Sequence, residues 1–414
     1  MFKIDEKTLK EYARLGVEVG VNVQPGQPLQ IMASVEAYEL VRECVKVAYE
    51  KSASRVMVEY MDGQNSKQDY LHQKIETLCE VPEWQLQKME YNIASDYCRL
   101  MITGDDPDAM NGVDAEKIQQ AAIARMKATA KYRYYSMNSV GQWSILAYPE
   151  VHWARKVFPG LEDDQAMECL WKAILMTSRV ELGKTVSNWK GHNEELRSHT
   201  EKLNDYGFRA LHFKNGLGTD LRVGLVKDHI WEGGSECSKG KYKTDFVANI
   251  PTEEVFTMPD RYHIDGTVYS SKPLAHNGKV IPSFSLTFKD GKVIGYKAED
   301  NEEVLKNILD TDEGSRSLGE VALISYDSPI SRSGILFYDT LFDENASCHL
   351  ALGACYPTTV KGGDQLSKEE LYALGGNDSM NHVDFMFGTA DLSVTGETYD
   401  GEMITVFESG NFVF

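Results

Sequence analysis

The chain has 414 residues, of which 42% are hydrophobic and 26% charged, and its formal net charge is -20. A chain of this length exceeds the size at which a single core keeps growing, so we expect two domains. The acidic balance argues against a nucleic-acid partner, because phosphate binding needs basic surface. The sequence has no run of about eighteen apolar residues, which argues against a membrane span. The charged amino terminus lacks an apolar signal core, which predicts a cytoplasmic protein.

The first half of the chain alternates between helical and extended patterns. Apolar residues at helical spacing predict helices over residues 7–21, 38–51, 115–131, 165–178 and 189–205. Shorter apolar or alternating runs predict strands over residues 28–33, 54–60, 97–103 and 143–147. Strands that alternate with helices predict a parallel sheet with right-handed crossovers. We therefore expect residues 1–205 to form an α/β domain.

Short extended runs separated by glycine turns dominate the second half. They predict strands over residues 209–213, 221–225, 283–288, 292–298 and 404–408, and one helix is predicted over residues 301–309. This change of pattern places the domain boundary near residue 205. The sequence thus predicts that an α/β domain is followed by a β-rich α+β domain over residues 206–414.

The most informative stretch is FDENASCHLALGACYP, which covers residues 342–357. It contains two possible metal ligands, Glu344 and His349, and the phenol of Tyr356. Divalent zinc, cobalt or manganese accepts carboxylate oxygen together with imidazole nitrogen, but one such pair cannot complete a coordination sphere. Further ligands must therefore come from other segments.

His382 and Asp384 lie two residues apart in the sequence NHVD. On an extended strand, residues two apart project from the same face, so both side chains can reach one ion. Glu254 and Glu320 are two further candidate ligands, which brings the inventory to four carboxylates and two imidazoles from four segments. That set suits two ions with a shared carboxylate better than one ion. A chain with 63 acidic residues and 10 histidines also produces each short motif by chance.

The seven cysteines are widely scattered, and no two of them form a CxxC pair. Reduced thiols are the simplest interpretation of this spacing. Cys348 and Cys355 fall within residues 342–357, which raises the alternative of thiolate ligation. We expect both to pack as small apolar side chains, the commoner role of a free cysteine.

Four segments of the chain closely resemble motifs of the aminopeptidase T family, the M29 group of metallo-aminopeptidases. The segments are NIPTEEVF at residues 249–256, SLGEVA at 317–322, DENASCH at 343–349 and NHVD at 381–384. The resemblance extends over essentially the whole chain and is greatest to the bacterial PepS and AmpS members. Several separated motifs in the correct order make it more specific than one short pattern.

The resemblance implies a dinuclear metal site in the second domain. Its ligand positions correspond to Glu254, Glu320, Glu344, His349, His382 and Asp384. It further implies that Glu320 bridges the ions and that Tyr356 lies beside them. Glu253 and Glu254 are adjacent and would point to opposite faces of a strand, so the choice of Glu254 follows the family pattern. The family is homodimeric, which implies a homodimer here as well.

The implied activity is removal of amino-terminal residues from peptides with a free amino terminus. Two divalent ions (zinc, cobalt or manganese, with magnesium as a further candidate) activate a bridging water and polarise the scissile carbonyl. The free amine of the substrate can bind one ion, which would restrict cleavage to the terminal residue. Tyr356 is a candidate donor to the developing oxyanion, and Glu253 is a candidate proton shuttle for the leaving amine.

Two other classes of protein remain open at this point. A different dinuclear hydrolase, such as a phosphoesterase or an amidase, could use similar ligands. A phosphoesterase needs basic residues near the phosphate, and Arg261, Arg316 and Lys361 are not far from the ligands in sequence. The other alternative is a non-catalytic protein in which metal only braces the fold. Structural zinc sites are usually rich in cysteine, which this carboxylate-rich set is not.

Overall fold

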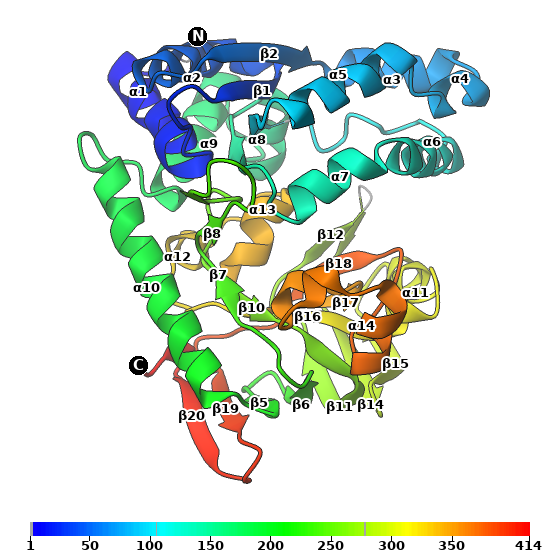
Figure 1. The fold of residues 1–414 in the computed structure, drawn as a ribbon. Coiled ribbons are helices and arrows are strands. Elements are labelled where there is room, and N and C mark those ends of the chain that lie inside the picture. Colours follow the sequence, from blue (N-terminus) through cyan, green and yellow to red (C-terminus); the bar gives the residue numbers. More distant parts are fainter. Residues whose placement is uncertain (1–2, 105, 277–278) are drawn as a thin grey trace. The chain divides into compact units, whose positions relative to one another are not determined.

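The computed structural model describes residues 3–104, 106–276 and 279–414. The chain divides into two compact units, one formed by Met1–Gly191 and Ser235–Pro251, the other by His192–Gly234 and Thr252–Phe414 (Figure 1). The change of unit at residue 191 falls inside helix α10 (Thr185–Tyr206). That the chain forms two separately folding domains with a boundary near residue 205 stays a prediction. Within the described residues, no helix is long and apolar enough to cross a membrane.

The first unit is built around a parallel four-stranded sheet in the order β2-β1-β3-β4. Its strands are β1 (Pro28–Ser34), β2 (Arg55–Met61), β3 (Cys98–Thr103) and β4 (Trp143–Ala147), and β8 (Glu236–Cys237) pairs separately with β9 (Asp245–Phe246). The helical segments are α1 (Glu6–Arg14), η1 (Leu15–Gly20), η2 (Val35–Ala37), α2 (Tyr38–Glu50), α3 (Gly63–His72), α4 (Ile75–Cys79), α5 (Glu83–Ala94), α6 (Ala115–Ala128), α7 (Ala130–Met137), α8 (Val151–Val157) and α9 (Asp163–Thr177). The predicted parallel α/β arrangement is confirmed.

Two of the predicted helices differ from the observed ones in detail. The helix expected over residues 7–21 changes at Leu15 from α-helix to a π-helical segment. The helix expected over 115–131 is interrupted at Thr129, whose hydroxyl donates to the Arg125 carbonyl at 2.8 Å. Helices α3 and α4 were not predicted, and neither buries a residue. Without a buried face, these helices have no apolar stripe for a sequence pattern to show.

The second unit is dominated by antiparallel sheets. The larger has the order β15-β14-β11-β6-β5-β19-β20-β21 and the smaller the order β18-β17-β16-β10-β7. The strands are β5 (Ala210–Lys214), β6 (Asp220–Leu225), β7 (Glu232–Gly233), β10 (Val255–Thr257), β11 (Pro259–Tyr269), β12 (Leu274–His276), β13 (Lys279–Ile281), β14 (Phe284–Lys289), β15 (Lys292–Ala298), β16 (Leu318–Leu323), β17 (His349–Gly353), β18 (His382–Met386), β19 (Ser393–Glu397), β20 (Met403–Glu408) and β21 (Asn411–Phe412). The helical segments after α10 are α11 (Glu302–Leu309), η3 (Gly314–Arg316), α12 (Pro329–Ser333), α13 (Thr340–Asp343), η4 (Glu344–Ala346), η5 (Pro357–Thr359), η6 (Gly363–Gln365) and α14 (Lys368–Leu374). The predicted β-rich second half is confirmed.

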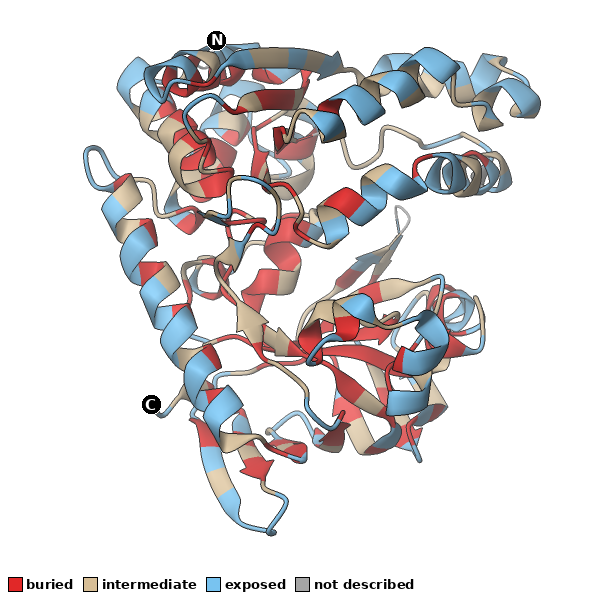
Figure 2. Cartoon of the chain, in the orientation of Figure 1, coloured by how far each residue is buried: buried red, intermediate tan, exposed pale blue. Residues whose placement is uncertain are grey.

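The five-stranded sheet has two chemically different faces. Every residue of β16 and β17 is buried (Figure 2). Alternate residues on one face belong to the hydrophobic core, namely Val255, Val321, Leu323, Leu350, Leu352, Val383 and Phe385. The residues between them project from the other face, because side chains alternate along a strand. The candidate functional side chains lie on that second face.

Candidate metal centre

Four of the predicted ligands lie on adjacent strands of this sheet: Glu320 on β16, His349 on β17, and His382 with Asp384 on β18. The register pairs Glu320 with Ala351, and Ala351 in turn with Asp384. Residues directly opposite one another share a face, as do residues two apart on one strand. All four side chains therefore project from the face opposite the hydrophobic core.

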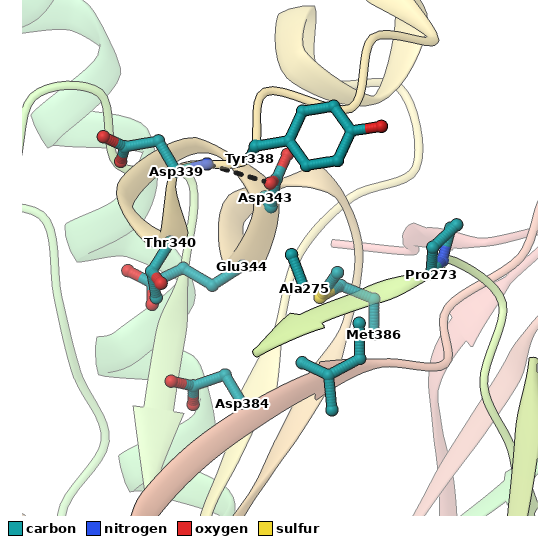
Figure 3. Close-up of a pocket in the computed structure, with 10 residues that line it drawn as sticks. Pro273, Ala275, Tyr338, Asp339, Thr340, Asp343, Glu344, Asp384 and Met386 are labelled. Atoms are coloured by element: carbon teal, nitrogen blue, oxygen red, sulfur yellow. Dashed lines mark hydrogen bonds between the residues drawn. The ribbon is translucent and has the colours of Figure 1, made fainter. Parts of the chain in front are cut away.

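The other two predicted ligands come from beside the sheet. Glu254 immediately precedes β10 and is buried, and its Oε2 lies 3.3 Å from the Nε2 of His349. Glu344 begins the short helix η4, which directly follows α13. Its side chain and that of Asp384 line the same pocket (Figure 3). The structure thus brings six residues from four separate segments toward one region of the second unit.

Glu320 is the central member of this cluster. Its Oε1 lies 3.3 Å from the Nε2 of His349, while its Oε2 lies 3.5 Å from the Nε2 of His382. Asp384 Oδ1 lies 3.4 Å from the Nε2 of His382 and 3.9 Å from that of His349. Within the described part of the chain, the side chains form two groups with metal-ligand spacing. One contains Glu254, Glu320 and His349, and the other contains Glu320, His382 and Asp384.

The orientation of His382 is set by a backbone contact. Its Nδ1 lies 2.8 Å from the carbonyl oxygen of Ala354, an arrangement in which Nδ1 carries the proton and donates. In the neutral imidazole, Nε2 is then the nitrogen with a free lone pair, and it faces Glu320 and Asp384. Metal-binding histidines commonly donate their second ring nitrogen in this way. His382 is therefore oriented as a ligand would be.

Crowding of the acids shows in the carboxylate pKa values. Burial, opposed by the charge of His349, raises the pKa of Glu254 to about 7. Burial and the charges of Asp384 and Glu254 hold the pKa of Glu344 well above its usual range. Burial penalises the charged form of these two carboxylates, and neighbouring anions add to that effect. A divalent cation would relieve the repulsion among these anions.

The two imidazoles respond in the opposite direction to simple burial. Burial lowers the pKa of His349, but the hydrogen bond to Glu320 and the charge of Glu254 outweigh it and raise the pKa to about 9. Burial of His382 is likewise outweighed by its hydrogen bond to Asp384 and that carboxylate's charge, which raise the pKa to about 10. The surrounding carboxylates thus favour positive charge at both imidazoles. The donor set of carboxylates and imidazoles fits zinc, cobalt or manganese.

The pocket beside Glu344 and Asp384 has one apolar and one acidic side (Figure 3). Its walls are formed by Pro273, Leu274, Ala275, Tyr338, Asp339, Thr340, Asp343, Glu344, Asp384 and Met386. Asp343 accepts backbone N–H groups from Phe337 at 2.7 Å and Asp339 at 3.2 Å, so one carboxylate fixes the backbone on both sides of residue 338. Tyr338 between them has a φ of 56°, a left-handed conformation that is unusual for a bulky residue. Strained conformations of this kind often occur at functional sites.

Tyr356 lies beside the cluster, as its expected role requires. Its ring centroid is 4.9 Å from that of His382 and 5.8 Å from that of Phe256. Burial and the charges of Glu320 and Asp384 hold the pKa of Tyr356 well above its usual range, so the phenol stays protonated and can donate. The residue as a whole is 37% exposed, and its hydroxyl has no hydrogen-bond partner among the described residues. A core tyrosine would have bonded this hydroxyl to backbone.

Glu253 occupies a different environment from its neighbour Glu254. Its backbone N–H donates to the Oδ1 of Asn345 at 2.8 Å, and its Oε2 lies 3.8 Å from the Nε2 of His192. Glu253 belongs to neither of the two ligand groups found in the described residues. The adjacent glutamates are thus directed to different partners, as expected for extended backbone.

Burial disfavours the thiolate form of both cysteines in the 342–357 stretch. Burial raises the pKa of Cys348 to about 12 and that of Cys355 to about 11. The Cys348 thiol also contacts the backbone of Ile324, with Sγ 3.3 Å from both its nitrogen and its oxygen. Neither thiol belongs to a ligand group formed by the described residues. This packing agrees with the role expected for them.

Two contributors to the site carry no chemical group that a motif search would detect. Ala351 lies between Glu320 and Asp384 in the register, so a small side chain occupies the centre of the cluster. Ala354 supplies the carbonyl that orients His382. Alternation of small and large residues in HLALG, at residues 349–353, was the available signal for Ala351. The role of Ala354 depends on its backbone carbonyl, so no side chain in the sequence indicates it.

Comparison with known proteins agrees with this geometry. The family described as "Thermophilic metalloprotease (M29)" matches residues 5–412. Aminopeptidase AmpS of Bacillus subtilis (strain 168) is 42% identical over 98% of both chains, and aminopeptidase 2 of Geobacillus stearothermophilus is 44% identical over 99% of this chain and 98% of its own. The solved structure of wild-type AmpT from Thermus thermophilus matches with a TM-score of 0.91 and 37% identity, covering 99% of this chain and 100% of that one. A match of this extent confirms the resemblance seen in the motifs, and the chain belongs to the M29 family of metallo-aminopeptidases.

Proposed function

We propose that this protein removes amino-terminal residues from peptides with a free amino terminus, through a site that holds two divalent ions and a bridging water. The observation that carries the proposal is the position of Glu320. Its two oxygens face two different imidazoles, and it is the one residue shared by both ligand groups of the described chain. A carboxylate placed in this way is suited to bridge two ions. Glu254 and His349 would complete one side, and His382 and Asp384 the other.

Glu344 is assigned to the same centre as the sixth ligand. Its carboxylate is near enough to Asp384, Glu254 and Glu320 for their charges to raise its pKa. When bound, two divalent ions supply Lewis acidity and a water that ionises near neutral pH. The four carboxylates and two imidazoles hold such ions in place, and the buried face of the sheet keeps the ligands rigid.

The remaining tasks of the reaction fall to protein side chains. The phenol of Tyr356, protonated and next to His382, donates to the negative charge that develops on the carbonyl oxygen. Glu253 is the candidate to carry a proton to the leaving amine, since it is buried beside Glu254. The acidic cluster also offers contacts to the positively charged amino terminus of a peptide. The apolar walls of the neighbouring pocket, Pro273 and Met386 among them, can receive the first side chain.

Two structural observations weigh against the alternatives. Among the described residues that line the pocket beside the cluster, none is an arginine or lysine, whereas a phosphoesterase needs such groups for its substrate. Arg316, one of the basic residues considered from the sequence, forms an ion pair with Asp310 at 2.5 Å. A purely structural zinc site usually uses cysteines, and neither ligand group of the described residues contains one.

Metal removal combined with a blocked substrate tests this function. Protein stripped with a chelator should lose hydrolysis of an unblocked aminoacyl amide and regain it with zinc, cobalt, manganese or magnesium added singly. The acetylated amide should be hydrolysed poorly, because acetylation removes the amine that the site recognises. Full activity of the stripped protein would refute the metal requirement. Equal rates on free and acetylated substrates would instead indicate an endopeptidase or amidase.

A further inference from the structure

Arg261, near the start of β11, is a buried cation. The residue is 5% exposed. Its guanidinium carbon lies 3.7 Å from the ring centroid of Tyr372 and 5.0 Å from that of Tyr262. Its Nε and Nη1 have no hydrogen-bond partner within the described residues. No carboxylate of the described chain forms an ion pair with it either.

This environment is unusual for arginine. A guanidinium remains charged in proteins and has five N–H donors in its plane. Burial of a charge is costly unless the charge is paired and its donors are satisfied. The face of the Tyr372 ring offsets part of the cost of burying the charge. A cation–π contact nevertheless leaves the N–H donors in the guanidinium plane without acceptors. The site therefore lacks an acceptor that can reach the edge of the guanidinium.

Arg261 lines a pocket of its own. The other lining residues are Asp312, Glu313, Gly314, Lys368, Tyr372, Asp378, Ser379 and Met380. This pocket shares no residue with the one beside the candidate metal centre. Nε and Nη1 are both closed to solvent, whereas Nη2 is not one of these buried, unbonded atoms. Nη2 is therefore the part of Arg261 that is open to the pocket.

The acids of this pocket already have partners. Asp378 pairs with Lys368 at 3.0 Å, and Glu313 pairs with Lys292 at 2.9 Å. Asp312 accepts from the Met380 backbone N–H at 2.6 Å and from the Ser379 hydroxyl at 2.7 Å. None of these acids forms an ion pair with Arg261, although Lys292 and, to a smaller extent, Arg261 lower the pKa of Glu313.

We propose that this pocket is a binding site for a carboxylate, with Arg261 as its anchor. A carboxylate in the pocket can accept from Nη2, whereas Nε and Nη1 are buried. A charge-assisted hydrogen bond of this kind is stronger than one between neutral groups. The stacked Tyr372 ring holds the plane of the guanidinium fixed for such a ligand. A doubly charged phosphate is less suited, since Asp312, Glu313 and Asp378 lie around the same pocket.

The proposal is tested with acetate as the probe and the full chain as the protein. Thermal unfolding would be followed in sodium acetate and in sodium chloride at equal ionic strength, for wild type and for Arg261→Met. We expect acetate to raise the Tm of wild type by about 2 °C relative to chloride, through ligand linkage. Arg261→Met should show no such shift from this pocket, and its Tm in chloride should equal or exceed that of wild type, because an unpaired buried charge has been removed.

Two further variants make the result specific. Arg316→Met removes a nearby arginine that is paired with Asp310, so the acetate shift should remain. Arg261→Lys keeps the charge but moves the donor away from the position of Nη2, so the shift should shrink. Acetate bound at a metal ion elsewhere would stabilise wild type and Arg261→Met equally, and only their difference reports on this pocket. The proposal is overturned if that difference is zero, or if Arg316→Met loses the shift as completely as Arg261→Met does.

Discussion

The clearest test of the candidate metal centre is how the stability of the metal-free protein depends on pH. The pKa of His349 is raised to about 9 in the folded chain, from 6.5 for an unperturbed histidine. The folded state therefore holds this proton more tightly than the unfolded state does. The resulting stabilisation is fully present below about pH 6.5 and is lost as the pH rises through 9. A difference of about 2.5 pH units corresponds to about 3 kcal/mol from His349 alone.

Metal binding should abolish this dependence, because the ions displace the proton and take over the contacts to the carboxylates. Urea denaturation of chelator-stripped and metal-loaded protein at pH 6.5, 8 and 9.5 measures the effect. The stripped protein should lose stability steadily over this range, while the loaded protein should not. His349→Asn should reduce the dependence of the stripped protein without removing it, because His382 keeps a raised pKa. His263→Asn should leave it, since His263 pairs with Asp260 at the surface. A stripped protein with constant stability across this range would refute the reasoning.

Four further predictions concern the site and the assembly. Tyr356→Phe should lower turnover about a hundredfold to a thousandfold, with metal content and KM near wild type, as expected for loss of one oxyanion donor; metal loss would make Tyr356 a ligand instead. Glu320→Gln should weaken binding of both ions together, as measured by metal analysis, and loss of only one ion would make it a terminal ligand. Ala351→Val should weaken metal binding about tenfold to a hundredfold, because two added methyl groups overfill the centre of the cluster, and unchanged affinity would show that the ions lie elsewhere. The homodimer expected from the family should appear in light scattering at twice the chain mass of 46.6 kDa, and a concentration-independent monomer would contradict it.

Features that depend on neighbouring residues could be predicted from the sequence, whereas features that depend on pairing between distant segments could not. His382 and Asp384 would share one face if NHVD were extended, and both do lie on strand β18. The strand register that places Ala351 between Glu320 and Asp384 depends on pairing between segments about thirty residues apart, and no periodicity within one segment encodes it. The family motifs supplied the ligand set for the same reason, since Glu254 and Glu320 had no distinctive spacing of their own. Helices α3 and α4 lacked any buried stripe from which to be predicted.

The burial of Arg261 shows the same limit. Nothing in the residues around position 261 distinguishes this arginine from one at the surface. No acid of its pocket forms an ion pair with it, because Asp312, Glu313 and Asp378 are held by hydrogen bonds or ion pairs to other groups. Pairing of this kind is decided by side chains that are distant in sequence.

The strands that present the ligands also form the core on their other face. Leu350 lies between His349 and Ala351, and Val383 lies between His382 and Asp384, with both apolar side chains in the hydrophobic core. Any shift of one strand to relieve a poorly packed core residue must therefore move a ligand by the same amount. Heat resistance and metal retention should consequently change together among variants of this chain. Selection for a tighter core would also select for slower loss of metal, without any change in a ligand.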